Sequence, residues 1–447
     1  MAVSQNPSAP GGAPAGDAHR RGGLAPIWNL LTDRLVRGSA LLLLATVELA
    51  AGGFLYWQVV AHRFGPADIG EANALVSASV LIGGLALLGM HNSVIRFLNA
   101  WPDRAATINT ALTVVAVAAA GTSAVFVAGS EWFAPRLAAM LHHPATAALF
   151  TLSTCGYALC LVNDNVFVAL GRSGFILSRN TVIVLLRLGL PLLLGAWGAI
   201  GVFTAYQVPV VFALLVYLVI LGRRLGLPVR PVVCRDRVAA MWRYSVWNYL
   251  ATLILTAPSL IMPIMVAERI DATNAGYYTI ASLLASVLAF VPQATSRSFF
   301  AEAMRDRARL RVVLGRVIRL TAAAQIPLLL VLVVGGRLVL RLFGTGYPAA
   351  YPLLLLLATT QALTSVGFVG STLLMIVGRL RLLCVLSAVA SSAALASAYL
   401  LIGHGLIFAG WSLLVGEAFL VVSYVLLIRV AFRGGLGMRG AAATQLS

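Results

Sequence analysis

The chain has 447 residues, of which 60% are hydrophobic and only 10% are charged, and its formal net charge is +18. Soluble globular domains carry about 25% charged residues, so this composition excludes an ordinary soluble fold. Apolar stretches of roughly 20 residues, the length that crosses a bilayer as a helix, fill almost all of the chain. The sequence therefore predicts an all-α polytopic membrane protein whose function resides in its helices, because the loops are too short to form a catalytic domain.

The first 37 residues are rich in Ala, Gly and Pro and lack the spacing that would bury a core, which predicts a disordered cytoplasmic tail. The first apolar run, 39–60, is longer than the h-region of a signal peptide and has no small-residue cleavage pattern behind it, so it is expected to remain as the first helix. Further spans, about twelve in all, are expected at 72–95, 107–128, 146–170, 175–196, 199–221, 244–267, 276–298, 317–334, 352–376, 381–402 and 406–428.

The arginines set the expected orientation. With the N-terminus inside, most of them fall on the cytoplasmic side, Arg179 included, and the arginines outside are Arg63, Arg136, Arg269, Arg337 and Arg341. The positive-inside rule then places both termini in the cytoplasm of a multi-pass protein of the cell (plasma or inner) membrane. In this assignment Arg187 is the single arginine buried within a span.

The sequence repeats itself. RFGPADIG from Arg63 follows the first helix, and RIDATNAG from Arg269 follows the seventh, about 206 residues later. ALGR ending at Arg172 and IVGR ending at Arg379 recur at nearly the same offset. Because six is even, two six-helix lobes would enter the membrane in the same sense, related by a pseudo-two-fold axis along the membrane normal around a central cavity. The expected division is a tail (1–37), an N-terminal lobe (38–221), a basic cytoplasmic inter-lobe loop (222–240), a C-terminal lobe (241–430) and a cytoplasmic tail (431–447).

Two basic segments lie between spans. Pro228 and Pro231 prevent a continuous helix through the inter-lobe loop. The segment RDRARLRVVLGR, from Arg305, has a helical charge spacing and is expected at the inner membrane surface. The favoured interpretation of both segments is topogenic charge against anionic lipid head groups, and the alternative is a specific ligand site.

Several motifs resemble a known family. The first helix, the loop RFGPADIGEANAL and a second helix ending in LGMHNSVIRFLN with Arg96 resemble the N-terminal signature of polysaccharide flippases. These are the Wzx-like branch of the multidrug/oligosaccharidyl-lipid/polysaccharide (MOP) exporter superfamily. NDNVFVALGRSGF continues the resemblance, which covers most of residues 38–430. It implies a MATE-like fold of two bundles that alternate between inward-open and outward-open V shapes, and export of a polyprenyl-diphosphate-linked oligosaccharide.

Arg187 is the first candidate for the substrate pathway. An arginine at the centre of a helix costs roughly 2.5 to 3.5 kcal/mol on insertion scales, so it needs a partner or water. Asp164 lies on the neighbouring predicted helix, and Asn180 lies two turns before Arg187 on the same face. Two interpretations remain open: an Arg187–Asp164 ion pair that only holds two helices together, or a cavity-facing guanidinium that binds the diphosphate of the lipid-linked sugar.

Arg96 and Arg297 occupy near-equivalent places at the inner ends of the second and eighth spans. They are candidates to gather a diphosphate at the cytoplasmic entrance, and helix-end anchoring is the equal alternative.

The remaining polar candidates are uncharged amides and two carboxyl groups. Glu48 and Glu417 lie near mid-depth in the first and twelfth spans, where each could carry a coupling proton or simply bond across a helix pair. Gln207 and Gln361 suit sugar hydroxyls, although amides also hold helices together.

Enzyme motifs are not found: the chain has no phosphate-cradling loop with a lysine and no nucleophile elbow. The histidines and cysteines have no metal-ligand spacing, so neither a metal nor a cofactor is expected.

The favoured function is a flippase that translocates a lipid-linked oligosaccharide by alternating access. The expected partners are that substrate and membrane lipids, with a polysaccharide polymerase or glycosyltransferases as candidates, and no nucleic acid. The alternatives are a cation-coupled multidrug exporter of the same fold, with acids lining its cavity, and a non-transporting scaffold for envelope biosynthesis.

Overall fold

The computed structural model describes residues 34–305, 310–376 and 379–433. The expected tails at 1–33 and 434–447 and part of the second basic segment, at 306–309, lie outside these ranges. Within them, twelve helical segments are long and apolar enough to cross a membrane, as the sequence predicted. Each such helix satisfies its own backbone hydrogen bonds, which is why helices suit the bilayer interior.

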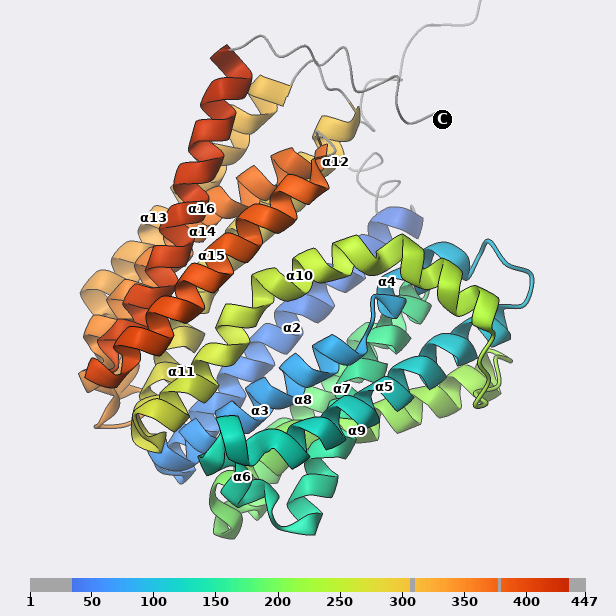
Figure 1. The fold of residues 1–447 in the computed structure, drawn as a ribbon, viewed down its shortest axis with the longest axis horizontal. Helices are drawn as coiled ribbons and strands as arrows, with labels where there is room; N and C mark the ends of the chain where they lie inside the picture. Colours follow the sequence, from blue (N-terminus) through green and yellow to red (C-terminus); the bar gives the residue numbers. More distant parts are fainter. Residues whose placement is uncertain (1–33, 306–309, 377–378, 434–447) are drawn as a thin grey trace, which may run out of the picture.

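The helices form two lobes (Figure 1). The N-terminal lobe contains α2 (Arg34–Arg63), α3 (Pro66–Ala86), α4 (Met90–Phe97), α5 (Arg104–Phe133), α6 (Pro135–Leu141), α7 (Pro144–Ala169), α8 (Gly174–Leu193) and α9 (Gly198–Arg224). The C-terminal lobe contains α10 (Arg235–Arg269), α11 (Ala272–Ser286), α12 (Phe290–Arg305), α13 (Leu310–Arg341), α14 (Tyr351–Ile376), α15 (Leu380–Leu401) and α16 (Ile407–Arg433). Short 3₁₀ turns join some of them at Gly195–Trp197, Val287–Ala289, Tyr347–Ala350 and Ile402–His404.

The internal repeat is visible in the packing. α2 lies against α8 in the first lobe as α10 lies against α15 in the second, and α8–α9 and α15–α16 are likewise paired. The arginines of the repeated motif make equivalent backbone hydrogen bonds, since the Arg172 N–H donates to Phe167 O (2.8 Å) and the Arg379 N–H donates to Leu374 O (2.9 Å). The two lobes are therefore structural copies of one another.

The lobes form a V (Figure 1). They meet where α3 packs against α11, and they diverge toward the side at which α2 begins and α16 ends. α10 runs between the lobes, against α3 and α4 on one side and α15 on the other. We call the side where the lobes meet the closed end, and the other side the open end.

The second span is broken rather than continuous, contrary to the helix expected at 72–95. α3 ends at Ala86 and α4 begins at Met90, after Gly89 with a left-handed φ of 74°. A Cβ atom at Gly89 would lie 2.7 Å from the Ser245 Cβ atom of α10. Only glycine combines this backbone conformation with so close an approach.

The link between the lobes is an extended strap. Residues 225–234 separate α9 from α10, and the backbone of 228–234 pairs with polar side chains of α5. Asn109 Oδ1 accepts from the Arg230 N–H (3.1 Å), and Thr110 Oγ1 accepts from the Cys234 N–H (3.2 Å). The strap therefore ties the start of α10 to the N-terminal lobe. The second basic segment, from Leu310 onward, is the first part of α13, and its location at the inner membrane surface stays a prediction.

Candidate functional site

A cavity of about 280 Å³ lies between the lobes near the closed end. Its lining comes from α2 and α3 of the first lobe and from α10, α11, α14 and α16 of the second: Trp57, Asn73, Ser259, Tyr278, Thr279, Ser282, Leu283, Ala285, Ser286, Leu357, Gln361 and Leu413. None of these twelve residues is charged. The lining combines hydroxyl and amide groups with an aromatic ring, on both sides of the lobe interface.

Several of the lining groups retain free hydrogen-bonding capacity. Among the described residues, the Gln361 amide, the Tyr278 hydroxyl and the Trp57 indole N–H have no hydrogen-bond partner, whereas the Ser282 hydroxyl donates to Thr279 O (2.9 Å). Polar groups inside a membrane protein are normally paired, because an unpaired group costs several kcal/mol in hydrocarbon. Unpaired groups around one cavity are therefore suited to a polar, uncharged ligand or to water.

The floor of the cavity is a contact between repeat-related residues. Asn73 Nδ2 donates to Thr279 Oγ1 (3.0 Å), and these two residues are 206 positions apart. One turn nearer the closed end, a Cβ atom on Gly70 would lie 2.0 Å from Ala272 O, and one on Gly276 would lie 2.0 Å from Pro66 O. The glycines of the two repeated loop motifs thus allow α3 and α11 to touch, which seals the cavity on this side.

Asp164 does not pair with Arg187. Both carboxylate oxygens of Asp164 accept from Arg179: Nη1 bonds Oδ1, and Nη2 lies 3.0 Å from Oδ2. Arg179 is 4% exposed and lies inside the span of α8, so the prediction that Arg187 is the single arginine buried within a span was wrong. Nη2 also donates to Asn180 Oδ1 (3.0 Å), and Asn180 Nδ2 donates to Ala45 O (3.0 Å), so this network ties α7 and α8 to α2.

Arg187 is also buried, with 6% of its surface exposed, and it does not line the cavity between the lobes. Its Nε donates to Tyr206 O (2.9 Å), and its guanidinium carbon lies 3.6 Å from the centroid of the Tyr206 ring. The Tyr206 ring contacts Trp57 with a centroid separation of 5.8 Å. Arg187 is therefore one layer behind the cavity wall, to which Tyr206 and Trp57 connect it.

The two predicted carboxyl groups are half-buried and lie in different surroundings. Glu48 Oε1 accepts from Thr181 Oγ1 (2.5 Å), which bridges α2 and α8. Glu48 Oε2 and Glu417 Oε1 are buried, and neither has a hydrogen-bond partner among the described residues. Neither carboxyl group lines the cavity, and a role in ion coupling stays a prediction.

The other predicted residues are spread over the molecule. Gln207 is buried in the first lobe, where its Nε2 donates to Ser79 Oγ (3.2 Å). Arg96 is exposed near the open end, with its guanidinium carbon 4.4 Å from the ring centroid of Tyr244 on α10. The side chain of Arg297, on α12, lies outside the described part of the structure. Of the predicted substrate residues, Gln361 lines the cavity.

Sequence reasoning missed most of the cavity lining. Trp57, Asn73, Tyr278 and Thr279, all in that lining, were not singled out as candidate site residues. One available signal was the repeat offset, since Asn73 and Thr279 stand three residues after the repeated glycines.

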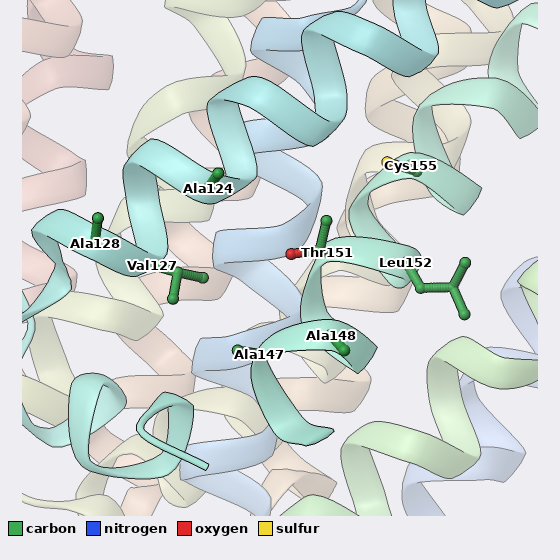
Figure 2. A pocket seen from close by; sticks show the side chains of 8 residues that line it. All are labelled: Ala124, Val127, Ala128, Ala147, Ala148, Thr151, Leu152 and Cys155. Atoms are coloured by element: carbon green, nitrogen blue, oxygen red, sulfur yellow. The ribbon is translucent and has the colours of Figure 1, made fainter. Parts of the chain in front are cut away.

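A second hollow faces outward between α5 and α7 (Figure 2). It has a volume of about 580 Å³ and is lined by Ala124, Val127, Ala128, Ala147, Ala148, Thr151, Leu152 and Cys155. The Thr151 hydroxyl oxygen already accepts a hydrogen bond from Ser123 Oγ (3.1 Å). Such an apolar groove on a membrane helix pair is suited to hydrocarbon rather than to a polar head group.

No group of metal-ligating side chains occurs among the described residues.

Two repeated helical bundles around a polar cavity define a membrane transporter fold, and comparisons with solved structures agree. The chain is similar to an inward-facing multidrug resistance MATE family transporter of the MOP superfamily, with 14% identity, 87% of this chain and 96% of that chain covered, and a TM-score of 0.63. It is also similar to the lipid II flippase MurJ in an inward closed conformation, with 10% identity, 86% of both chains covered and a TM-score of 0.70. An outward-facing MATE family transporter matches with 13% identity, 91% and 96% coverage and a TM-score of 0.58.

The sequence itself identifies the family. A family model described as "Polysaccharide biosynthesis protein" matches residues 65–350, which is more than half of the chain. The chain therefore belongs to this polysaccharide biosynthesis family. No curated protein matches the chain significantly.

Proposed function

We propose that this membrane transporter flips a polyprenyl-diphosphate-linked oligosaccharide, a precursor of a cell-envelope polysaccharide, from the cytoplasmic to the outer leaflet. The sugar would occupy the cavity between the lobes while the polyprenyl tail stays in lipid. The rocking of the lobes about α3 and α11 would expose the cavity to each side in turn.

The uncharged lining of the cavity carries this proposal. Sugar hydroxyls both donate and accept hydrogen bonds, so Gln361, with one acceptor and two donors, and Tyr278 suit them well. Trp57 adds an aromatic surface, and Leu357 and Leu413 add apolar ones, of the kind that pack against the C–H faces of sugar rings. A cation-coupled drug exporter would instead place carboxylates in this lining, and none of the lining residues is acidic.

The proposed orientation follows from charge. Arg223, Arg224 and Arg235 lie at the helix ends beside the inter-lobe strap, and Arg172 and Arg379 precede α8 and α15 on the same side of the membrane. The positive-inside rule places this side, which is the open end, in the cytoplasm of the inner membrane, together with both termini. The structure would then correspond to the state that receives substrate from inside the cell.

The test is a flipping assay in proteoliposomes that contain a polyprenyl-diphosphate oligosaccharide. Tyr278→Phe and Gln361→Leu remove hydrogen-bonding groups from the cavity, and each should slow translocation by roughly tenfold, the equivalent of about 1.4 kcal/mol. Thr359→Val is the matched control, since Thr359 lies on the same helix as Gln361 but is exposed on the outer surface.

Two results would contradict the proposal. Folded native protein that does not translocate the lipid-linked sugar but exports cationic drugs would assign it to the exporter class. Cavity variants that leave cell-surface polysaccharide unchanged would favour the scaffold class.

A further inference from the structure

A separate pocket of about 450 Å³ lies at the open end, where α2 and α8 begin. It is lined by Gly38, Leu41, Gly171, Arg172, Ser173, Gly174, Phe175 and Ser178. None of these eight residues is acidic. The pocket shares no lining residue with the cavity between the lobes, so it is a second candidate site.

The start of α8 presents donors to this pocket. The backbone turns at Gly171, which has a left-handed φ of 67°, and α8 then runs for 20 residues from Gly174. The N–H groups of Ser173 and Gly174 have no backbone acceptor within the described residues, as is usual for the first turn of a helix. These free donors and the positive end of the helix dipole favour an anion at this position.

Two side chains strengthen the case. Ser173 is 6% exposed and lines the pocket, yet its hydroxyl group has no hydrogen-bond partner among the described residues. Arg172 is exposed and forms no ion pair within the same part of the chain. The Ser173 hydroxyl can therefore donate to a ligand or water in the pocket, and the Arg172 guanidinium, which lines the same pocket, offers a phosphate a fork of donors.

The depth of the pocket indicates where the anion comes from. The candidate membrane spans begin at Ala40 on α2 and at Gly174 on α8, so the pocket lies beside the starts of both candidate spans, where they would leave the hydrocarbon. The anions concentrated at this level are the phosphates of lipid head groups. We propose that the Gly171–Gly174 turn is a binding site for the phosphate of a membrane lipid.

The second lobe supplies a natural control. Arg379 repeats the backbone hydrogen bond of Arg172, but the residue that follows it is Leu380, where the first lobe has Ser173. An arginine and the start of a helix are therefore present in both lobes, whereas the serine hydroxyl is present only in the first lobe. The site is expected in the N-terminal lobe alone.

Native mass spectrometry of the full-length protein tests this proposal with three probes. Phosphatidylglycerol offers a phosphodiester, farnesyl diphosphate offers the diphosphate of a polyprenyl lipid, and phosphatidylcholine is the zwitterionic reference. Arg172→Ala and Ser173→Ala should each weaken the tightest anionic binding event, by roughly tenfold for the arginine. Arg379→Ala should leave it unchanged.

Each outcome decides the proposal. A selective loss for phosphatidylglycerol assigns the site to a structural phospholipid, and a selective loss for farnesyl diphosphate assigns it to loading of the transported lipid; both support a lipid-phosphate site. An equal loss in Arg379→Ala, or unchanged binding in Ser173→Ala, would reduce the interaction to surface charge and overturn the proposal. The site does not depend on the proposed sugar substrate, because binding is measured without transport.

Discussion

Arg136 and Glu268 cap each other's helices across the lobe interface. The Glu268 carboxylate on α10 accepts from the first free N–H groups of α6, those of Arg136 (3.1 Å) and Leu137 (3.0 Å). In return the Arg136 guanidinium donates to Ala267 O (2.6 Å) and Ile270 O (3.3 Å) at the end of α10. Since helix ends leave such groups unpaired, this reciprocal contact latches the two lobes together at the closed end.

Breaking this latch should favour opening of the closed end. Glu268→Ala or Arg136→Ala is expected to remove about 1 to 3 kcal/mol from the closed state, because charged hydrogen bonds are lost. Accessibility of a cysteine placed at Ser282, labelled from the closed side by an impermeant maleimide, measures the effect. Glu131→Ala is the control, since its pair with His142 is mostly exposed. If the two residues form one latch, the double variant should label like either single variant.

The glycine contact at the closed end gives a second prediction. Gly276→Ala places a methyl group 2.0 Å from Pro66 O, which neither backbone can accommodate, so α3 and α11 must separate. Transport should be lost, and labelling at the closed side should become constitutive. Gly53→Ala, on α2, has no atom within 4 Å of its added methyl group and should transport normally. A Gly276→Ala protein that is folded and fully active would show that this contact is not required for the cycle.

The Arg179–Asp164 pair is expected to stabilise the first lobe. Asp164→Ala leaves a buried guanidinium without a counter-charge and should destabilise the protein by about 3 to 5 kcal/mol. Asp164→Ala combined with Arg179→Leu removes both charges and should recover most of the loss. The unfolding temperature in detergent is the measurement. If Arg187→Leu rather than Arg179→Leu recovered the stability lost in Asp164→Ala, Asp164 would pair with Arg187, as the sequence suggested.

Arg187 should act through Tyr206. Arg187→Ala and Tyr206→Leu each abolish the contact between guanidinium and ring, so both should slow flipping to the same degree, and the double variant should add little. Tyr206→Phe keeps the ring and the backbone carbonyl that accepts from Nε, and it should be close to native. Direct diphosphate binding by Arg187 would instead make Arg187→Ala far more severe than Tyr206→Leu.

Ion coupling can be tested at Glu417. Glu417→Gln keeps the size of the side chain but cannot release a proton, so a protein driven by a proton gradient should retain its fold and lose the stimulation by an imposed pH difference. Glu48→Gln is the comparison in the other lobe. Unchanged stimulation in both variants would remove these residues from the coupling mechanism.

The sequence by itself determined the membrane class, the twelve spans and the two-lobe repeat. These follow from local rules: a spanning helix needs a long apolar run, and charges flank it. The glycines of the two loop motifs, Gly70 and Gly276, also identified the repeat, and in the structure a Cβ atom on either one would lie 2.0 Å from a carbonyl oxygen of the other copy.

Only the tertiary structure decided which partner each polar group has. Asp164 had two arginines within reach on the next helix, and the rotation and tilt of α8 gave it Arg179 and turned Arg187 toward Tyr206. The same applies to the cavity, whose lining comes from six helices of both lobes. The hydrophobic pattern of a single helix cannot fix its rotation when lipid and protein interior are equally apolar, so these contacts depend on packing between helices.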